Sequence, residues 1–172
     1  MVNFKSTIEK KDMFFEKLLL VRRHTKVTKG GRVFGFSVLT VVGDKNGKIG
    51  IGKGRAKEVP SAIQKAMDRA RKNLVDINIH NHTIYSKFIF KYCATKVVML
   101  PGYEGSGIIS PSSVRSIFEA AGIKNVFVKC FGSKNPCVLI KCIFEALLKM
   151  NDNFKAIALR QSLLKKTDKN KI

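Results

Sequence analysis

The first third of the chain constrains the fold more than any other part, because strand-forming runs alternate there with tight turns. Residues 32–43 (RVFGFSVLTVVG) combine aromatic and β-branched side chains with a two-residue alternation typical of a strand. A turn at 44–47 follows, where asparagine and glycine tolerate a positive φ, and residues 47–54 form the returning strand. An earlier strand at 15–28 leads into a Gly30–Gly31 turn. Three consecutive strands joined by tight turns are therefore predicted.

A helix is predicted after these strands, over residues 58–75. Pro60 falls in its first turn, where the missing N–H has no partner to lose. Apolar side chains recur at three- and four-residue spacing, which is typical of a helix with one buried face. They are Ile63, Ala66, Met67, Ala70 and Leu74. The first unit is thus predicted as β-β-β-α, a three-stranded sheet with the helix on one face and a free polar face.

The second half predicts another α+β unit, with the order β-β-α-β-α. A polar break at 76–83 precedes strand-like residues that alternate with lysines up to Leu100. Ser110 or Ser112 can cap the next helix, which Gly122 ends. A strand at 125–131 and a helix at 137–150 complete the unit. The parts predicted for the chain are a flexible arm at 1–14, a first domain at 15–78, a second domain at 79–152 and a basic extension at 153–172.

Basic residues dominate the composition. The chain has 33 Lys+Arg against 12 Asp+Glu, a formal net charge of +21, and such an excess opposes compaction unless an anionic partner neutralises it. Glycines beside many of these cations bring the backbone close to a partner, which suits the phosphate backbone of RNA. The candidate RNA-binding residues are Arg22, Arg23, Lys26, Lys29, Gly30, Gly31, Arg32, Lys48, Lys53, Arg55 and Lys57.

Membrane and metal functions find little support in the sequence. No run approaches the roughly 20 apolar residues of a membrane-spanning helix, and the N-terminus lacks a signal-peptide core, so neither a membrane partner nor export is predicted. The four cysteines show no C-x-x-C spacing and lie far along the chain from the histidines, so we predict no metal and no other cofactor. Buried, reduced thiols are expected instead at Cys93, Cys130, Cys137 and Cys142.

Two glycine-rich motifs fall short of catalytic signatures. Residues 47–54 (GKIGIGKG) nearly match a nucleotide-binding P-loop, but Gly54 stands where a hydroxyl should hold magnesium, and the segment alternates as a strand. Residues 102–107 (GYEGSG) contain Ser106 but not the Gly-x-Ser-x-Gly pattern, and no histidine or aspartate is placed to activate the hydroxyl. We therefore predict that the protein is not an enzyme.

Six motifs, in this order and spacing, resemble the ribosomal small-subunit protein five family of the bacterial type. The match covers roughly residues 15–152. The motifs are VTKGGRVF at 27–34, LTVVGD at 39–44, EVPSAIQKA at 58–66, EGSGII at 104–109, AGIKNV at 121–126 and FGSKNP at 131–136.

The resemblance implies a first domain like a double-stranded-RNA-binding fold and a β-α-β-α sandwich as the second. It implies binding to small-subunit rRNA near the decoding region and mRNA entry, contacts with small-subunit proteins four and eight, and a non-catalytic role in assembly and translational accuracy. By position, the loop at 26–32 would lie on rRNA with Arg23 beside it, and Gly107 and Arg115 toward protein four. The family often has an aromatic residue where Lys53 stands, so a phosphate contact is expected there.

Other interpretations stay open at this point. The runner-up is a free double-stranded-RNA-binding module outside the ribosome, and a P-loop NTPase is more distant. The loops at 104–109 and 132–136 favour the ribosome, because a free module would not need a second domain facing RNA and protein. A cytoplasmic ribosome is expected, or an organellar one if the chain is encoded in an organelle.

Overall fold

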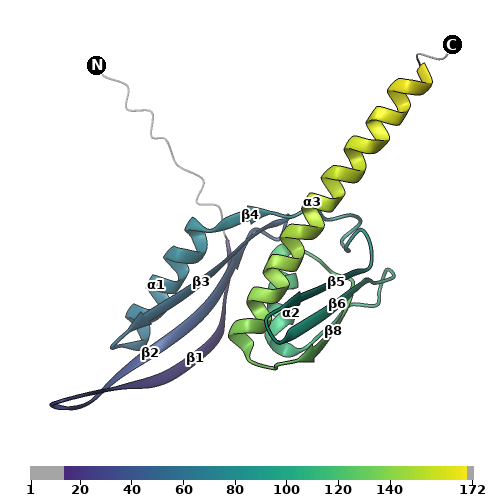
Figure 1. Ribbon diagram of the computed structural model, residues 1–172. Coiled ribbons are helices and arrows are strands. Elements are labelled where there is room, and N and C mark those ends of the chain that lie inside the picture. The colour runs from purple at the N-terminus through teal and green to yellow at the C-terminus, as the bar shows by residue number, and fades with distance from the viewer. Residues whose placement is uncertain (1–13, 170–172) are drawn as a thin grey trace, which may run out of the picture.

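The computed structural model describes the backbone of residues 14–169 and the side chains as far as residue 153. The predicted arm at 1–14 therefore lies outside the described residues except at its last position, and so do the side chains of the predicted extension after residue 153. Two sheets with helices packed against them give an α+β fold, as the sequence predicted (Figure 1). The first sheet has four strands and not the predicted three, because a short strand after the helix pairs with its edge.

The first sheet is antiparallel throughout and has the order β1-β2-β3-β4. Its hairpin connections follow from the glycine-containing turns between the alternating runs. Helix α1 packs on one face of this sheet. The bounds are β1 Phe15–Thr28, β2 Gly31–Gly43, β3 Lys48–Ala56, α1 Val59–Lys72 and β4 Leu74–Asp76.

The second sheet has the order β5-β6-β8-β7, with the short β7 parallel to β8. Helices α2 and α3 both contribute to the core on its inner face, and the end of α3 projects from the body of the molecule (Figure 1). The bounds are β5 Phe88–Tyr92, β6 Thr95–Pro101, β7 Ile108–Ile109, α2 Ser112–Ala121, β8 Val126–Gly132 and α3 Pro136–Lys169.

Several predicted boundaries were wrong for local reasons. Helix α1 ends at Lys72, and Leu74 belongs instead to β4, where Gly50 of β3 is its partner. Neither Ser110 nor Ser112 caps α2, because Pro111 occupies the N-cap position and no side chain bonds there. The predicted end of that helix is confirmed, since Gly122 adopts a left-handed φ of 90°.

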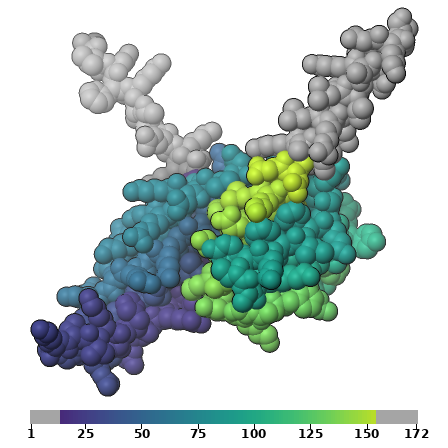
Figure 2. Space-filling model, in the orientation of Figure 1, coloured from purple at the N-terminus to yellow at the C-terminus, as the bar shows by residue number. Residues whose placement is uncertain are grey.

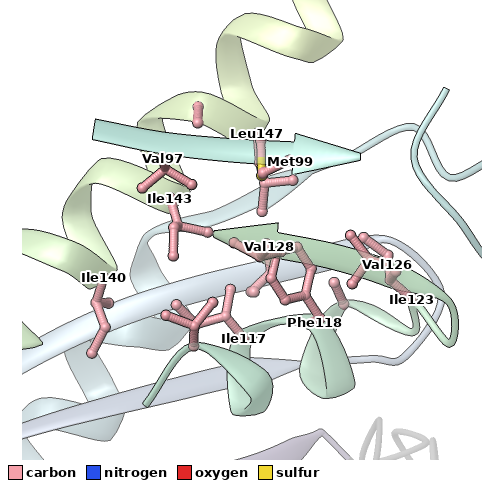
Figure 3. Packing of buried hydrophobic residues seen from close by; sticks show 14 of the residues in the cluster. Val97, Met99, Ile117, Phe118, Ile123, Val126, Val128, Ile140, Ile143 and Leu147 are labelled. Carbon is pink, nitrogen blue, oxygen red and sulfur yellow. The ribbon is translucent and has the colours of Figure 1, made fainter. Parts of the chain in front are cut away.

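The expectation of a free polar face on the first sheet was also wrong. Leu39, Val41 and Ile49 join the core of the second unit, which places α2 against the sheet face opposite α1. This core continues through the residues that Figure 3 labels, among them Phe118 of α2 and Met99 of β6. The apolar residues of β2 alternate between two buried faces, so the sheet is a middle layer of the molecule.

The loop between β2 and β3 joins the two units through backbone hydrogen bonds. The N–H of Lys45 donates to the carbonyl of Ala120 (3.0 Å), and that of Gly47 donates to the carbonyl of Ala121 (2.9 Å). These carbonyls lie in the last turn of α2, where a helix has no internal donors left. Lys17 on β1 adds an ion pair with Glu119 of α2 at 2.7 Å. The first unit thus supplies hydrogen-bond donors to the last carbonyls of a helix in the second unit.

Candidate nucleic-acid interface

Strands β1 and β2 extend beyond the rest of the first sheet as a two-stranded ribbon. Strand β3 pairs with β2 only as far as Phe36, whereas β1 and β2 remain paired to Thr28 and Gly31. All the residues at 22–34, here called the ribbon, are exposed, and Figures 1 and 2 show it projecting from the body in purple and dark blue. The ribbon has no core of its own, so its side chains are available to a partner.

The tip of the ribbon is a two-residue turn at Lys29–Gly30. Gly31, which follows the turn, takes a positive φ of 128°, whereas Gly30 does not lie in that region. The hydroxyl of Thr28 donates to the carbonyl of Gly31 across the closing pair at 3.0 Å. A turn is therefore present one residue earlier than the predicted Gly30–Gly31, and the positive φ falls on Gly31, the first residue of β2.

Each face of the ribbon carries cations. Arg22 and Lys26 lie on one face with His24 between them, because side chains two residues apart share a face. Arg23 lies on the other, where its guanidinium sits 5.2 Å from the centroid of the Phe34 ring. Such a cation–π contact holds the charge in a defined position without neutralising it. Residues 22–34 contain no Asp or Glu, so the ribbon cannot balance these charges internally.

The basic surface continues from the ribbon onto β3. Arg22, Ser37 and Arg55 are direct neighbours across three adjacent strands, which places the two arginines on one sheet face. Lys53 follows on the same face, and Lys57 is exposed just beyond the end of β3. These predicted residues therefore adjoin the ribbon.

Lys48 is the exception among the predicted RNA-binding residues. It begins β3 at the far end from the ribbon, where its partner across the ladder is Asp76 of β4. Arg55 lies seven positions further along the strand, about 23 Å at the usual rise per residue. The structure does not bring Lys48 together with the others.

The glycines of β3 have a structural role that the sequence interpretation missed. Gly50, Gly52 and Gly54 face α1, and a Cβ on any of them would overlap a carbonyl oxygen of the helix. Those carbonyls belong to Ala70, Ala66 and Ala62, the residues that α1 buries. Glycines two residues apart on a strand are about 6.6 Å apart, and alanines four residues apart on a helix are about 6 Å apart. The three glycines of β3 can therefore each lie opposite one of the three alanines of α1. These glycines allow α1, and not RNA, to lie close to the strand.

Gly107 and Arg115 lie close together in the second unit, apart from the ribbon. Gly107 has a φ of 69° and its N–H donates to the side chain of Asn125 at 3.1 Å. The Arg115 guanidinium donates to the carbonyl of Ile108 at 2.7 Å and borders a cavity of about 660 Å³ between the two units. Lys45 and Lys124 also line this cavity, and sequence spacing gave no signal of that grouping.

The two glycine-rich motifs considered for catalysis have structural roles. Residues 48–56, which nearly match a P-loop, form a strand. The Oγ of Ser106 donates to the carbonyl of Tyr103 at 2.8 Å within its own loop. Within the part of the chain that the structure describes, no group of three or more His, Cys, Asp or Glu could hold a metal ion, and no helix is long and apolar enough to cross a membrane.

The cysteines were predicted to be buried, and only Cys142 is; Cys93 is exposed and the other two are half-buried. Burial raises the pKa of the Cys142 and Cys130 thiols, which favours their neutral form. All four thiols are free in the structure.

Two joined α+β units with an acid-free basic ribbon define a class of protein suited to phosphate backbones. Family models match both units: ribosomal protein S5, N-terminal domain, over residues 14–78, and ribosomal protein S5, C-terminal domain, over residues 90–160. The chain therefore belongs to the ribosomal protein S5 family.

Curated relatives agree with this assignment. Small ribosomal subunit protein uS5 of Alteromonas mediterranea is 48% identical over 147 residues, which is 86% of this chain and 89% of the relative. Its counterpart in Psychrobacter is 44% identical over 153 residues, 89% of this chain and 93% of the relative. That of Hahella chejuensis is 50% identical over 135 residues, which is 78% of this chain and 81% of the relative. These relatives support the ribosomal interpretation over a free double-stranded-RNA-binding module.

Proposed function

We propose that this protein is a structural component of the small ribosomal subunit and binds rRNA through its basic ribbon. The observation that carries the proposal is the ribbon itself, which presents cations on both faces and contains no carboxylate. Each phosphate that meets a lysine or arginine releases a condensed counterion, and this release makes binding favourable and salt-dependent. The names and similarity of the relatives support the ribosomal setting.

The ribbon and the neighbouring end of β3 form one proposed contact surface. Arg23 is held on Phe34, and Arg22 and Arg55 lie in one row, so the cations are positioned by the sheet before RNA arrives. Lys48 is proposed to meet a separate part of the rRNA. The residues assigned to the main surface are Arg22, Arg23, Lys26, Lys29, Gly30, Gly31, Arg32, Lys53, Arg55 and Lys57.

The finer assignments extend the resemblance to the family. Gly107 and Arg115 are proposed to face small-subunit protein four, with protein eight as a second neighbour and mRNA passing near the entry site. We also propose domains at 15–78 and 79–152, a role without catalysis, and residence on a cytoplasmic or organellar ribosome. The anchoring of Arg115 to the carbonyl of Ile108 supports a fixed contact point on the second unit.

Sedimentation tests this proposal directly. The tagged protein is followed through a sucrose gradient from its own cell lysate, at low and at high salt. Co-migration with small subunits that persists at high salt is expected of an integral component. Protein that stays at the top, or that leaves the subunits at modest salt, would contradict the proposal.

A charge-reversed pair of variants then isolates the ribbon. Arg32→Glu is expected to lower the fraction on small subunits, because it places a negative charge where a phosphate is proposed. Lys65→Glu changes the charge equally at an exposed position of α1 and serves as the matched control. Equal losses in both variants would point to net charge and not to the ribbon.

A further inference from the structure

The second sheet has an outer face that α2 and α3 do not cover. Both helices contribute to the core on the inner face, where Val97, Met99, Val126 and Val128 are buried (Figure 3). The alternate residues of the same strands point the other way and are exposed or half-exposed. We call them the open sheet face: Ile89, Lys91, Lys96, Val98, Leu100, Ile109, Phe127, Lys129 and Phe131.

Charge and apolar surface are segregated along this face. The ladder register places Lys91, Lys96 and Phe131 in one row across β5, β6 and β8. The last row is wholly apolar and joins Leu100, Phe127 and Ile109 across β6, β8 and β7. The middle row is mixed, and the four strands contain no Asp or Glu. The face thus has a cationic end and an apolar end.

Exposed apolar area of this kind marks a binding surface. Phe131 is 48% exposed, Ile89 51% and Ile109 54%, although a soluble sheet would normally turn polar residues outward. Protein–protein interfaces are depleted in lysine, which is the only charged residue type here. Lysines that flank an aromatic ring, on a four-stranded sheet whose outer face neither α2 nor α3 covers, instead suit single-stranded RNA, whose bases stack on rings while its phosphates meet cations.

We propose that the open sheet face binds a single-stranded segment of RNA, with a base stacked on Phe131 and the phosphates along Lys91, Lys96 and Lys129. The inference rests on the proposed function, since it adds a second RNA contact to the same protein. It differs in chemistry from the ribbon, where the exposed ring of Phe34 already holds Arg23. The ribbon meets phosphates, and the open sheet face also meets bases.

The test measures binding of the full chain to two probes over a range of salt. One is a single-stranded oligouridylate of eight nucleotides, and the other is a short RNA duplex. Phe131→Leu removes the ring but keeps an apolar side chain, and we expect about tenfold weaker oligouridylate binding with unchanged duplex binding. Phe131→Tyr keeps the ring and should retain affinity. Lys96→Gln should lower the salt slope for the oligonucleotide by about 0.7.

Two controls make every outcome informative. Lys65→Gln, exposed on α1, should leave the oligouridylate slope unchanged, and unchanged thermal unfolding of the Phe131 variants shows that they fold. Arg32→Gln in the ribbon should weaken duplex binding and spare the oligonucleotide. If Arg32→Gln instead abolished oligouridylate binding while Phe131→Leu had no effect, the inference would be overturned.

Sedimentation separates this inference from the proposed function. Wild-type protein that sediments with small subunits, combined with oligouridylate binding that ignores Phe131, would leave the proposed function intact and remove the inference. If Phe131→Leu left oligonucleotide affinity unchanged but released the protein from subunits, the face would bind a neighbouring protein, and the RNA assignment would be wrong. Protein absent from small subunits would overturn the proposed function itself.

Discussion

Residues 22–34 and 47–55 look alike in sequence but differ in their surroundings. Both are basic and punctuated by glycine. The first projects as an exposed ribbon, and a Cβ added at Gly30 or Gly31 would meet no atom within 4 Å. In the second, a Cβ on Gly50, Gly52 or Gly54 would overlap the backbone of α1. The same residue type therefore has two uses: it allows a positive φ next to the turn at Gly31, and on β3 it allows the close approach of a helix.

The difference has a geometric cause. On β3 the glycines repeat every two residues and so occupy a single face, which α1 meets with an alanine at every fourth position. At the ribbon tip the glycines are adjacent and serve the turn. The lysines and arginines beside the β3 glycines, such as Lys53 and Arg55, therefore point to the opposite face from the helix. A mixed basic and glycine-rich run can serve a protein contact and an RNA contact at once.

The largest effect is expected from Gly52→Val in β3. The new side chain would overlap the carbonyl of Ala66, and backbone atoms cannot yield as a flexible side chain can. We expect a loss of about 4 kcal/mol in the free energy of unfolding, or failure to fold, because overpacking a buried contact is among the most destabilising kinds of substitution. Denaturant unfolding followed by circular dichroism measures it.

Gly30→Ala is the matched control in the exposed segment. It adds a methyl group where the structure has open space, and we expect a change in unfolding free energy within about 0.5 kcal/mol. Similar losses for the two variants would show that the contact between β3 and α1 and the tip of the ribbon do not differ in packing.

The next effect concerns binding and not stability. Arg32→Glu should weaken binding to a small-subunit rRNA fragment by tenfold or more, about 1.4 kcal/mol at least, and lower its salt slope by about one. The reason is that the ribbon lacks any carboxylate that could already neutralise this arginine. Filter binding at several salt concentrations provides both numbers. An unchanged slope would remove Arg32 from the phosphate contacts.

A smaller effect separates the two glycines of the ribbon. Gly31→Ala places a side chain at a φ of 128°, which L-residues rarely adopt, and we expect a loss of about 1 kcal/mol. Gly30→Ala should be close to neutral. Thermal unfolding and RNA affinity measured together show whether the turn must be preorganised for binding. Equal behaviour of the two variants would contradict the conformation described for the turn.

The sequence predicted what periodicity and turn chemistry determine locally. The hairpin of β2 and β3, the presence of a glycine turn between β1 and β2, and the left-handed Gly122 all follow from residue types within a few positions of one another. The first of these turns lies at 29–30, one residue before the predicted Gly30–Gly31. Strand β4 was missed, because three residues cannot establish an alternation and Leu74 also fits the helical stripe before it. Its identity as a strand comes from pairing with β3, a contact distant in sequence.

The candidate site could be predicted where its residues are close in sequence, and not where they come from different strands. The cations of the ribbon are recognisable because they cluster along the chain, whereas the row of Arg22, Ser37 and Arg55 depends on register between three strands. The second buried face of the first sheet was missed because the alternation in β2 does not show that Leu39 and Val41 are covered. Only the position of α2 against them buries that face. Tertiary partners decided these points, and no local pattern encodes them.

The smallest expected effect distinguishes the two ends of β3. Arg55 adjoins the ribbon through its row with Arg22, whereas Lys48 lies at the opposite end of the strand, about 23 Å away. For a short RNA duplex that covers only the ribbon and the adjoining end of β3, Arg55→Gln should weaken binding about threefold. Lys48→Gln should leave the affinity within about twofold, since a charge beyond a Debye length is largely screened at physiological salt. Fluorescence anisotropy with both variants measures the difference. A larger loss for Lys48→Gln would mean that the duplex runs along β3 toward β4, and the contact surface would then have to be drawn along the strand and not around the ribbon.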